Sequence, residues 1–427
     1  MAKRFIFSLS LLMIALVATI AYHYYKPAPP LNDTIEYQYA ADNLLKNNIL
    51  YGGNPNQPVD FRLYSKRTLG YPVFLLFQQQ NEHLVLMSSV LLYVLLFFLG
   101  LHILSLFIRK KAAFLSYILL FLLHIAFTVH TTFQMADLLV AAAVTSIVLV
   151  YYSPNTTTYQ KVFYISLLWG LGLFLKPVFL PSLLLIPVIL IYLKRVTAKW
   201  HYWLLVPLAV WTTGCAVNYS SSGVFEYSSI STINLGQYNA KLTVANMDGV
   251  DAASNFAHSE AFSIPRTLPQ YVHYKQGVRK EAITAVQDNP LAYAKVHLAG
   301  MIKMVLDPGR FEIYTFFGMN DHKVSLTELL YSGDWDRVEE VMCKNKVVLF
   351  AFLALLFVGI LRVVLVSFSL KRVKEIFFML CITTYFVVIT GPVGAARFML
   401  PVGVLYLVLA AIGTQRILAF FQKRSKR

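Results

Sequence analysis

The stretch on which the rest of the chain depends is Asn32-Asp33-Thr34-Ile35-Glu36-Tyr37. It begins about ten residues after an apolar run, residues 5–22, that is long enough to cross a membrane. Lys3 and Arg4 precede this run and keep the N-terminus in the cytoplasm by the positive-inside rule. We therefore expect the Asp33 carboxylate at the water–lipid boundary on the outer face. The run could also be a cleaved signal peptide, but its length favours a retained anchor.

The composition is that of a polytopic membrane protein. Of the 427 residues, 57% are hydrophobic and 14% are charged, whereas a soluble domain has about 25% charged residues. The net charge of +16 does not indicate nucleic-acid binding, because most basic residues cluster in short runs between apolar segments. Such runs orient spans and contact anionic lipid headgroups. The three cysteines lack metal-ligand spacing and are interpreted as small apolar fillers rather than a disulfide framework.

Short basic runs predict the path of the chain across the membrane. They occupy residues 109–111, 194–199, 371–374 and 423–427. Lys176-Pro177 interrupts a long apolar segment with basic residues at both ends, so an even number of crossings is needed there. Residues 162–175 and 178–193 are therefore expected to form a hairpin with Lys176 at its outer tip. The remaining spans are predicted at residues 84–108, 112–129, 135–152, 202–219, 347–368, 376–390 and 399–417.

The predicted fold is an all-α polytopic membrane protein with about ten transmembrane helices and both termini in the cytoplasm. Two long loops lie outside, residues 23–83 and 220–344. The chain divides into an N-terminal catalytic module (1–219), an extracytoplasmic region with interfacial helices (220–344) and C-terminal transmembrane helices (345–427). Within the loops, helices are expected at residues 34–47, 275–288 and 291–306.

Several polar residues are expected at the outer face, and each also has a structural interpretation. Asp33, with Glu36 three residues later, has the spacing of a capping box for the helix that follows. Arg67 could extend to lipid headgroups. Asp137 lies near the start of a span, where a carboxylate can stay hydrated at a small cost in free energy. An acid within a span is nevertheless a candidate functional residue by default. Lys176 and Arg397 lie at outer turns.

In its order of motifs the chain resembles the bacterial glycosyltransferase-C superfamily, which includes protein mannosyltransferases and lipid A aminoarabinose transferases. The resemblance covers nearly the whole chain. It is carried by Asp33 with Tyr37, Arg67-Thr68-Leu69-Gly70-Tyr71-Pro72, Asp137, Lys176-Pro177 and Ala396-Arg397-Phe398-Met399-Leu400-Pro401. Two features depart from the family pattern: Leu69 replaces the first proline of the usual Pro-Gly-Tyr-Pro, and the second acid is aspartate where glutamate is more usual.

The resemblance implies transfer of a sugar from a polyprenyl-phosphate donor to a lipid, glycan or protein acceptor, outside the plasma (inner) membrane. A hydroxyl or amide acceptor is a poor nucleophile, so a carboxylate must orient it or accept its proton. Fixed cations can stabilise the lipid phosphate as it leaves. A single base without a carboxylate nucleophile favours inversion. The resulting candidates are Asp33 and Asp137 for catalysis, Arg67, Lys176 and Arg397 for the donor phosphate, and Tyr37 and Tyr71 for substrate binding.

Two questions stay open at the level of sequence. No metal or other cofactor is signalled by the histidines, but a divalent ion between Asp33 and Asp137 is compatible with the resemblance, since some members of the superfamily use one. Competing functions are an O-antigen ligase or polymerase, which takes a diphosphate-linked donor, and a lipid or sugar transporter or flippase. Against a transporter, the ionisable residues lie at the outer ends of spans and no internal repeat is visible.

Overall fold

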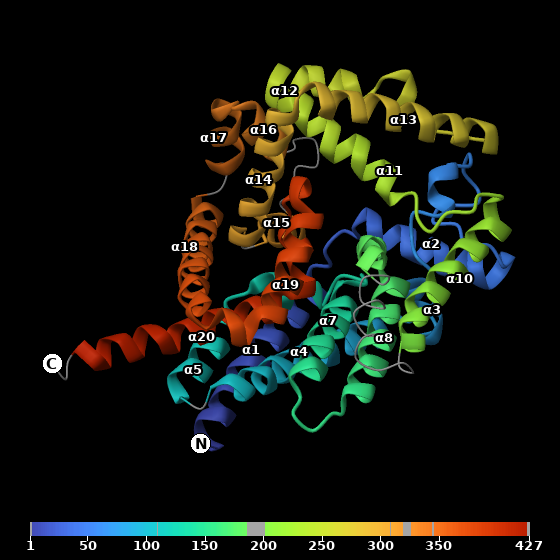
Figure 1. Cartoon of the computed structure of the whole chain (residues 1–427). Coiled ribbons are helices and arrows are strands. Elements are labelled where there is room, and N and C mark those ends of the chain that lie inside the picture. The colour runs from blue at the N-terminus through green and yellow to red at the C-terminus, as the bar shows by residue number, and fades with distance from the viewer. Residues whose placement is uncertain are drawn as a thin grey trace.

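The protein is described by a computed structural model that covers residues 2–108, 110–185, 201–307, 309–318, 326–343 and 346–424. Within these ranges every regular element is a helix, and no β-strand is present. Figure 1 shows a lower bundle, which contains α1, α4, α5, α7, α8 and α20, and an upper layer in which α12 and α13 lie side by side.

The bundle is formed by apolar helices, and α20 lies at its centre. The helices are α1 (Ala2–Tyr25), α4 (Glu82–Phe107), α5 (Lys111–Leu122), α7 (Asp137–Tyr152), α8 (Thr158–Leu175), α10 (Leu205–Ser222), α18 (Lys346–Ser369), α19 (Val373–Ile389) and α20 (Leu400–Arg424). α20 packs against α4, α5, α7 and α18. Every residue from 400 to 413 is buried, as expected for a helix that is apolar on all sides.

Within the described residues, three helical stretches are long and apolar enough to cross a membrane: Glu82–Phe107, Leu349–Ile389 and Ala396–Gln422. Their surroundings differ, since 89% of the most apolar window is buried in Ala396–Gln422 but only 17% in Leu349–Ile389. The exposed side chains of the latter include Phe350 and Phe357. A long helix with exposed aromatic and aliphatic side chains indicates a membrane protein, because lipid chains can cover such a surface.

The remaining helices lie above the bundle or beside it, where Figure 1 shows α2 and α3 next to α10. They are α2 (Asn32–Asn47), α3 (Gly70–Phe77), α6 (Ile125–His130), α11 (Ile230–Asn234), α12 (Lys241–Ala257), α13 (Leu268–Asp288), α14 (Pro290–Leu306), α15 (Arg310–Phe316), α16 (Leu326–Ser332) and α17 (Trp335–Cys343). Residues Leu235–Ala240 form a π-helical turn that joins α11 to α12. Single 3₁₀ segments lie at Phe61–Tyr64, Pro177–Leu185, His201–Leu204, Glu260–Phe262, Leu370–Arg372, Gly391–Val393 and Ala396–Met399.

Two of the expected helices differ from the structure, and a third lies partly outside the described residues. The span predicted at residues 112–129 is broken into α5 and α6 at His124, whose ring is hydrogen-bonded to buried Arg362 at 2.8 Å. The second arm of the expected hairpin begins as a 3₁₀ segment, Pro177–Leu185, and residues 186–193 lie outside the described part. The helix expected to begin at residue 275 begins at Leu268, because Thr267 and Gln270 form a capping box there.

A close backbone contact explains Gly70 at the start of α3. A Cβ atom at Gly70 would lie 2.5 Å from the carbonyl oxygen of Phe174, near the end of α8. The hydroxyl of Thr68 donates a hydrogen bond to the Leu175 carbonyl at 2.8 Å. The start of α3 is therefore held against the end of α8, which brings the residues before α3 close to Lys176.

Candidate functional site

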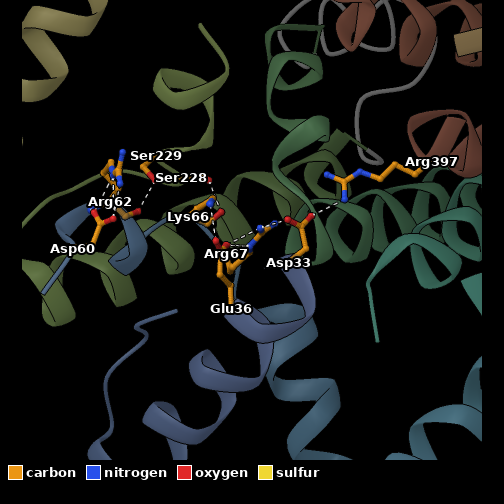
Figure 2. A network of polar contacts seen from close by, with 9 residues as sticks. All are labelled: Asp33, Glu36, Asp60, Arg62, Lys66, Arg67, Ser228, Ser229 and Arg397. Carbon is orange, nitrogen blue, oxygen red and sulfur yellow. Dashed lines mark hydrogen bonds and ion pairs between the residues drawn. The ribbon is translucent and has the colours of Figure 1, made fainter. Parts of the chain in front are cut away.

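Five charged residues that the sequence singled out lie together at one place between the bundle and the upper layer. Each comes from a different element: α2, the segment before α3, the first residue of α7, the residue after α8 and the Ala396–Met399 turn before α20. The residues are Asp33, Arg67, Asp137, Lys176 and Arg397. Figure 2 shows Asp33 between Arg67 and Arg397, which approach its carboxylate from opposite sides.

Asp33 is the centre of this group, which we call the ion-pair centre. Its Oδ1 accepts a hydrogen bond from Arg67 Nη2 at 2.6 Å, and its Oδ2 lies 3.1 Å from Arg397 Nη1. Burial alone would raise the pKa of Asp33, but the positive charges of Arg397 and Arg67 outweigh burial and hold that pKa well below its usual value. Asp33 is therefore ionised at neutral pH.

The capping interpretation of Asp33 is wrong. α2 begins at Asn32, with Leu31 at the N-cap position, so Asp33 lies inside the first helical turn. Its side chain is directed to the two arginines instead of to the backbone of α2. A negative charge in the first turn still stabilises the helix through the macrodipole. Acids are therefore common both at N-cap positions and in the first turn, and the sequence alone does not distinguish the two.

Glu36 and Lys66 extend the ion-pair centre, and neither was identified as a site residue from the sequence. Glu36 accepts hydrogen bonds from Lys66 Nζ and from Arg67 Nε, both at 2.6 Å. Arg67 thus contacts two carboxylates with one planar guanidinium, whose Nη2 lies 2.6 Å from both Asp33 Oδ1 and Glu36 Oε2. Lysine cannot reproduce this geometry. Glu36 lies one helical turn after Asp33, and this spacing was the available signal.

Asp137 and Lys176 form the second part of the centre. Lys176 Nζ donates to Asp137 Oδ1 at 2.6 Å, and Asp137 is only 1% exposed. The other oxygen, Oδ2, has no hydrogen-bond partner among the described residues. Lys176 also contributes to lowering the pKa of Asp33, so the two parts are close enough to interact. With four basic and three acidic side chains, the whole centre carries one excess positive charge.

Tyr37 and Tyr71, the expected substrate-binding residues, are both buried. Their rings meet edge to face with centroids 4.7 Å apart, and Arg67 lies over the Tyr37 ring at 5.0 Å. In this position they support the guanidinium of Arg67 by packing and by a cation–π contact. Substrate contact by either tyrosine stays a prediction.

A second polar network holds the Arg67 segment in place from the upper layer. Glu226 accepts hydrogen bonds from Ser65 and Tyr271, both at 2.5 Å, and from Lys275. Ser229 donates to the carbonyl of Arg62 at 2.8 Å, as Figure 2 shows. The segment that carries Arg67 is therefore joined by hydrogen bonds to the residues after α10 and to α13.

Glu312 is a further acid near the centre that the sequence analysis missed. It lies in α15, is fully buried, and neither side-chain oxygen has a hydrogen-bond partner among the described residues. Burial and the negative charge of Asp307 raise the pKa of Glu312 to about 7, and the nearby Arg397 partly opposes this shift. A lone acid after the Asp307-Pro308-Gly309-Arg310 turn was the only signal in the sequence.

In the described part of the chain, no group of three or more His, Cys, Asp or Glu side chains is arranged to hold a metal ion. Three oxygens of Asp33 and Asp137 are instead engaged by Arg67, Arg397 and Lys176. A divalent ion between the two acids stays a prediction.

Comparison of the chain with protein-family models, curated proteins and solved structures finds no match. The chemistry of the ion-pair centre is therefore the main indication of what the protein does.

Substitution of Lys176 by methionine would leave the buried Asp137 carboxylate without its counter-charge. We expect a loss of about 3–5 kcal/mol, the usual effect of breaking a buried pair. The double variant Lys176→Met/Asp137→Asn should recover most of this loss, since no charge is then left unpaired. Thermal unfolding of the purified protein in detergent measures the difference. Lys46→Met is the matched control, because Lys46 and Asp42 form an exposed pair that contributes ~0–1 kcal/mol. A Lys176→Met variant as stable as the wild type would show that Lys176 and Asp137 do not form a buried ion pair.

Glu312→Gln should make the protein more stable at alkaline pH. Because the folded-state pKa of Glu312 is raised to about 7 from 4.5, ionisation costs stability as pH rises through this range. The variant and the wild type should unfold at similar temperatures at pH 5 and diverge up to pH 8. The expected advantage of the variant at pH 8 is on the order of 1–3 kcal/mol. A difference that does not change with pH would show that Glu312 is not the titrating group.

Proposed function

We propose that the protein is a membrane glycosyltransferase of the glycosyltransferase-C type, which moves a sugar from a polyprenyl-phosphate donor to an acceptor outside the plasma membrane. The observation that carries the proposal is the Asp33 carboxylate held between Arg67 and Arg397. A carboxylate suits an acceptor hydroxyl, and guanidinium groups suit a phosphate, which they bind with paired hydrogen bonds. The same small volume thus contains the groups that both halves of the reaction require.

The topology proposed with this function has ten crossings, with both termini in the cytoplasm and residues 23–83 and 220–344 outside. It is supported by the basic runs of the sequence and by the position of the ion-pair centre, whose members come from the expected outer ends of the spans. In this arrangement a lipid-linked donor reaches the centre from the outer leaflet, and its phosphate lies at the depth of the headgroups.

The proposed reaction begins when the donor phosphate takes Arg67 and Arg397 away from Asp33. These arginines hold the pKa of the Asp33 carboxyl low, and a carboxylate with a low pKa is a weak base. Transfer of their hydrogen bonds to the phosphate would raise the basicity of Asp33. Donor binding and activation of the base are thereby coupled.

In the transfer step the acceptor oxygen attacks the anomeric carbon, and Asp33 receives the proton of the acceptor. The bond between that carbon and the phosphate oxygen breaks, and its electron pair remains on the polyprenyl phosphate. Arg67 and Arg397 stabilise the charge that develops on this leaving group. One carboxylate acts as a base and none as a nucleophile, so the configuration at the anomeric carbon should invert. Asp137 holds Lys176 in position as a further cation facing the phosphate.

The test is the substitution of Asp33 by asparagine. Asparagine keeps a polar side chain of the same size but cannot accept a proton, so we expect a loss of ~10²–10⁴ in the transfer rate per molecule of variant in the membrane. The variant should also be less stable, because Arg67 and Arg397 lose the charge of Asp33. Membranes that contain each variant are incubated with radiolabelled polyprenyl-phosphate sugars, and label in products is counted.

Asp60→Asn is the matched control. Asp60 lies in the same outer segment and pairs with Arg62 at 2.7 Å, outside the ion-pair centre, so this variant should transfer at the wild-type rate. Transfer by Asp33→Asn that equals the control would exclude Asp33 as the base.

A further inference from the structure

A second, unexplained site lies on the face of α2 that points away from the ion-pair centre. It is a cleft of about 370 Å³ between α2, the turn after α3 and the residues just before α7. Small-molecule sites usually have volumes of about 300–1,000 Å³. The part contributed by α2 recurs every three or four residues, as one helical face requires: Ile35, Gln38, Tyr39 and Asp42.

The lining is rich in neutral hydrogen-bonding groups. Gln38 Nε2 donates to Gln134 Oε1 at 2.8 Å, and Gln80 Nε2 donates to Asp42 Oδ1 at 2.9 Å. Each carboxamide has two N–H donors and an oxygen with two acceptor sites, so these pairs leave capacity unused. Tyr39 adds an aromatic ring with a polar tip.

This lining selects among ligand classes. The described residues that line the cleft include no basic side chain and one acid, Asp42. Lys46 is paired with that acid at 3.5 Å, so its charge is already balanced and a phosphate would meet the carboxylate of Asp42. The polar groups of the cleft do not suit a lipid chain. Carboxamide donors and acceptors beside an aromatic ring match the hydroxyl groups and C–H faces of a neutral sugar.

The backbone conformation at Gln80 indicates that the position of its side-chain amide in the cleft matters. Gln79 and Gln80 have φ angles of 51° and 52°, in the left-handed region that non-glycine residues rarely adopt. The N–H of Gln80 donates to the Leu75 carbonyl at 2.9 Å and so terminates α3. Glycine is the usual residue at such a position, since it adopts this conformation without strain. Gln80 instead accepts a strained backbone and directs its amide to Asp42.

We propose that this cleft binds a neutral, hydroxyl-rich saccharide that belongs to the acceptor, so that the acceptor is a glycan or glycolipid. The assignment of this saccharide to the acceptor rests on the proposed function, whereas saccharide binding in the cleft does not. The cleft and Asp33 lie on opposite faces of α2, whose diameter with side chains is about 10 Å. The site therefore holds sugar units beyond the one that reacts, and Gln134 links it to Asp137 three residues later.

The test measures saturation-transfer NMR signals of neutral saccharides, methyl α-D-glucopyranoside and N,N′-diacetylchitobiose, with the full chain in detergent. Gln80→Gly removes the amide and relieves the backbone strain, so it should fold at least as well as the wild type. Gln79→Gly makes the same backbone change at a residue that is exposed and outside the lining. We expect a signal in the wild type and Gln79→Gly and at least a three-fold weaker signal in Gln80→Gly.

No signal from either saccharide in the wild type would overturn the proposal, and so would equal signals in all three proteins. Signals from a neutral peptide, N-acetyl-triglycine methylamide, that exceed those of both saccharides would also overturn it. A protein that binds saccharide through Gln80 but shows no sugar transfer from a polyprenyl phosphate would contradict the proposed function alone, so the two failures are distinguishable.

Discussion

The ion pair that Asp33 shares with Arg67 and Arg397 is the interaction on which the arrangement of this molecule depends. It joins α2 and the segment before α3 to the Ala396–Met399 turn that precedes α20. Several buried charges at one point are costly, because each loses its hydration. That cost is offset only by accurate mutual geometry, and the network around Glu226 supplies the rigidity that such geometry needs.

The same constraint gives the centre its chemical character. Stability alone could be obtained by replacing buried charges with well-packed apolar residues. A centre that keeps four bases and three acids in nearly balanced pairs can exchange partners when an anion enters, since a phosphate offers the arginines a better ligand than a carboxylate shared between them. Among the described residues, neither Asp137 Oδ2 nor the buried carboxyl of Glu312 has a hydrogen-bond partner, so the interactions of both groups would change with such an exchange.

The sequence predicted what local pattern determines and missed what distant partners determine. The helices at 34–47, 84–108 and 291–306 were predicted to within about two residues at each end, because hydrophobic runs, Asn-Pro and turn residues mark their limits. The break at His124 was not predictable, since it accompanies a hydrogen bond to Arg362 on a distant helix. Asp33 resembled a cap because its partners are also distant in the sequence. The local sequence around an acid in the first helical turn is the same whether the side chain accepts from its own backbone or pairs with arginines elsewhere in the chain. The sequence predicted that the five charged residues lie on one side of the membrane but not that they pair with one another, and Glu312 gave no periodic or charge signal.

The central claim is that the arginines around Asp33 form a binding site for a lipid phosphate. Native mass spectrometry of the purified protein with a sugar-free polyprenyl phosphate and with the corresponding neutral polyprenol tests it most directly. The account predicts one tightly bound phosphate lipid per chain, weak binding of the alcohol, and a loss of phosphate affinity of about 10–100-fold in Arg397→Gln, the size of one charge-assisted hydrogen bond. Equal binding of the phosphate and the alcohol, or an Arg397→Gln variant with unchanged affinity, would contradict it.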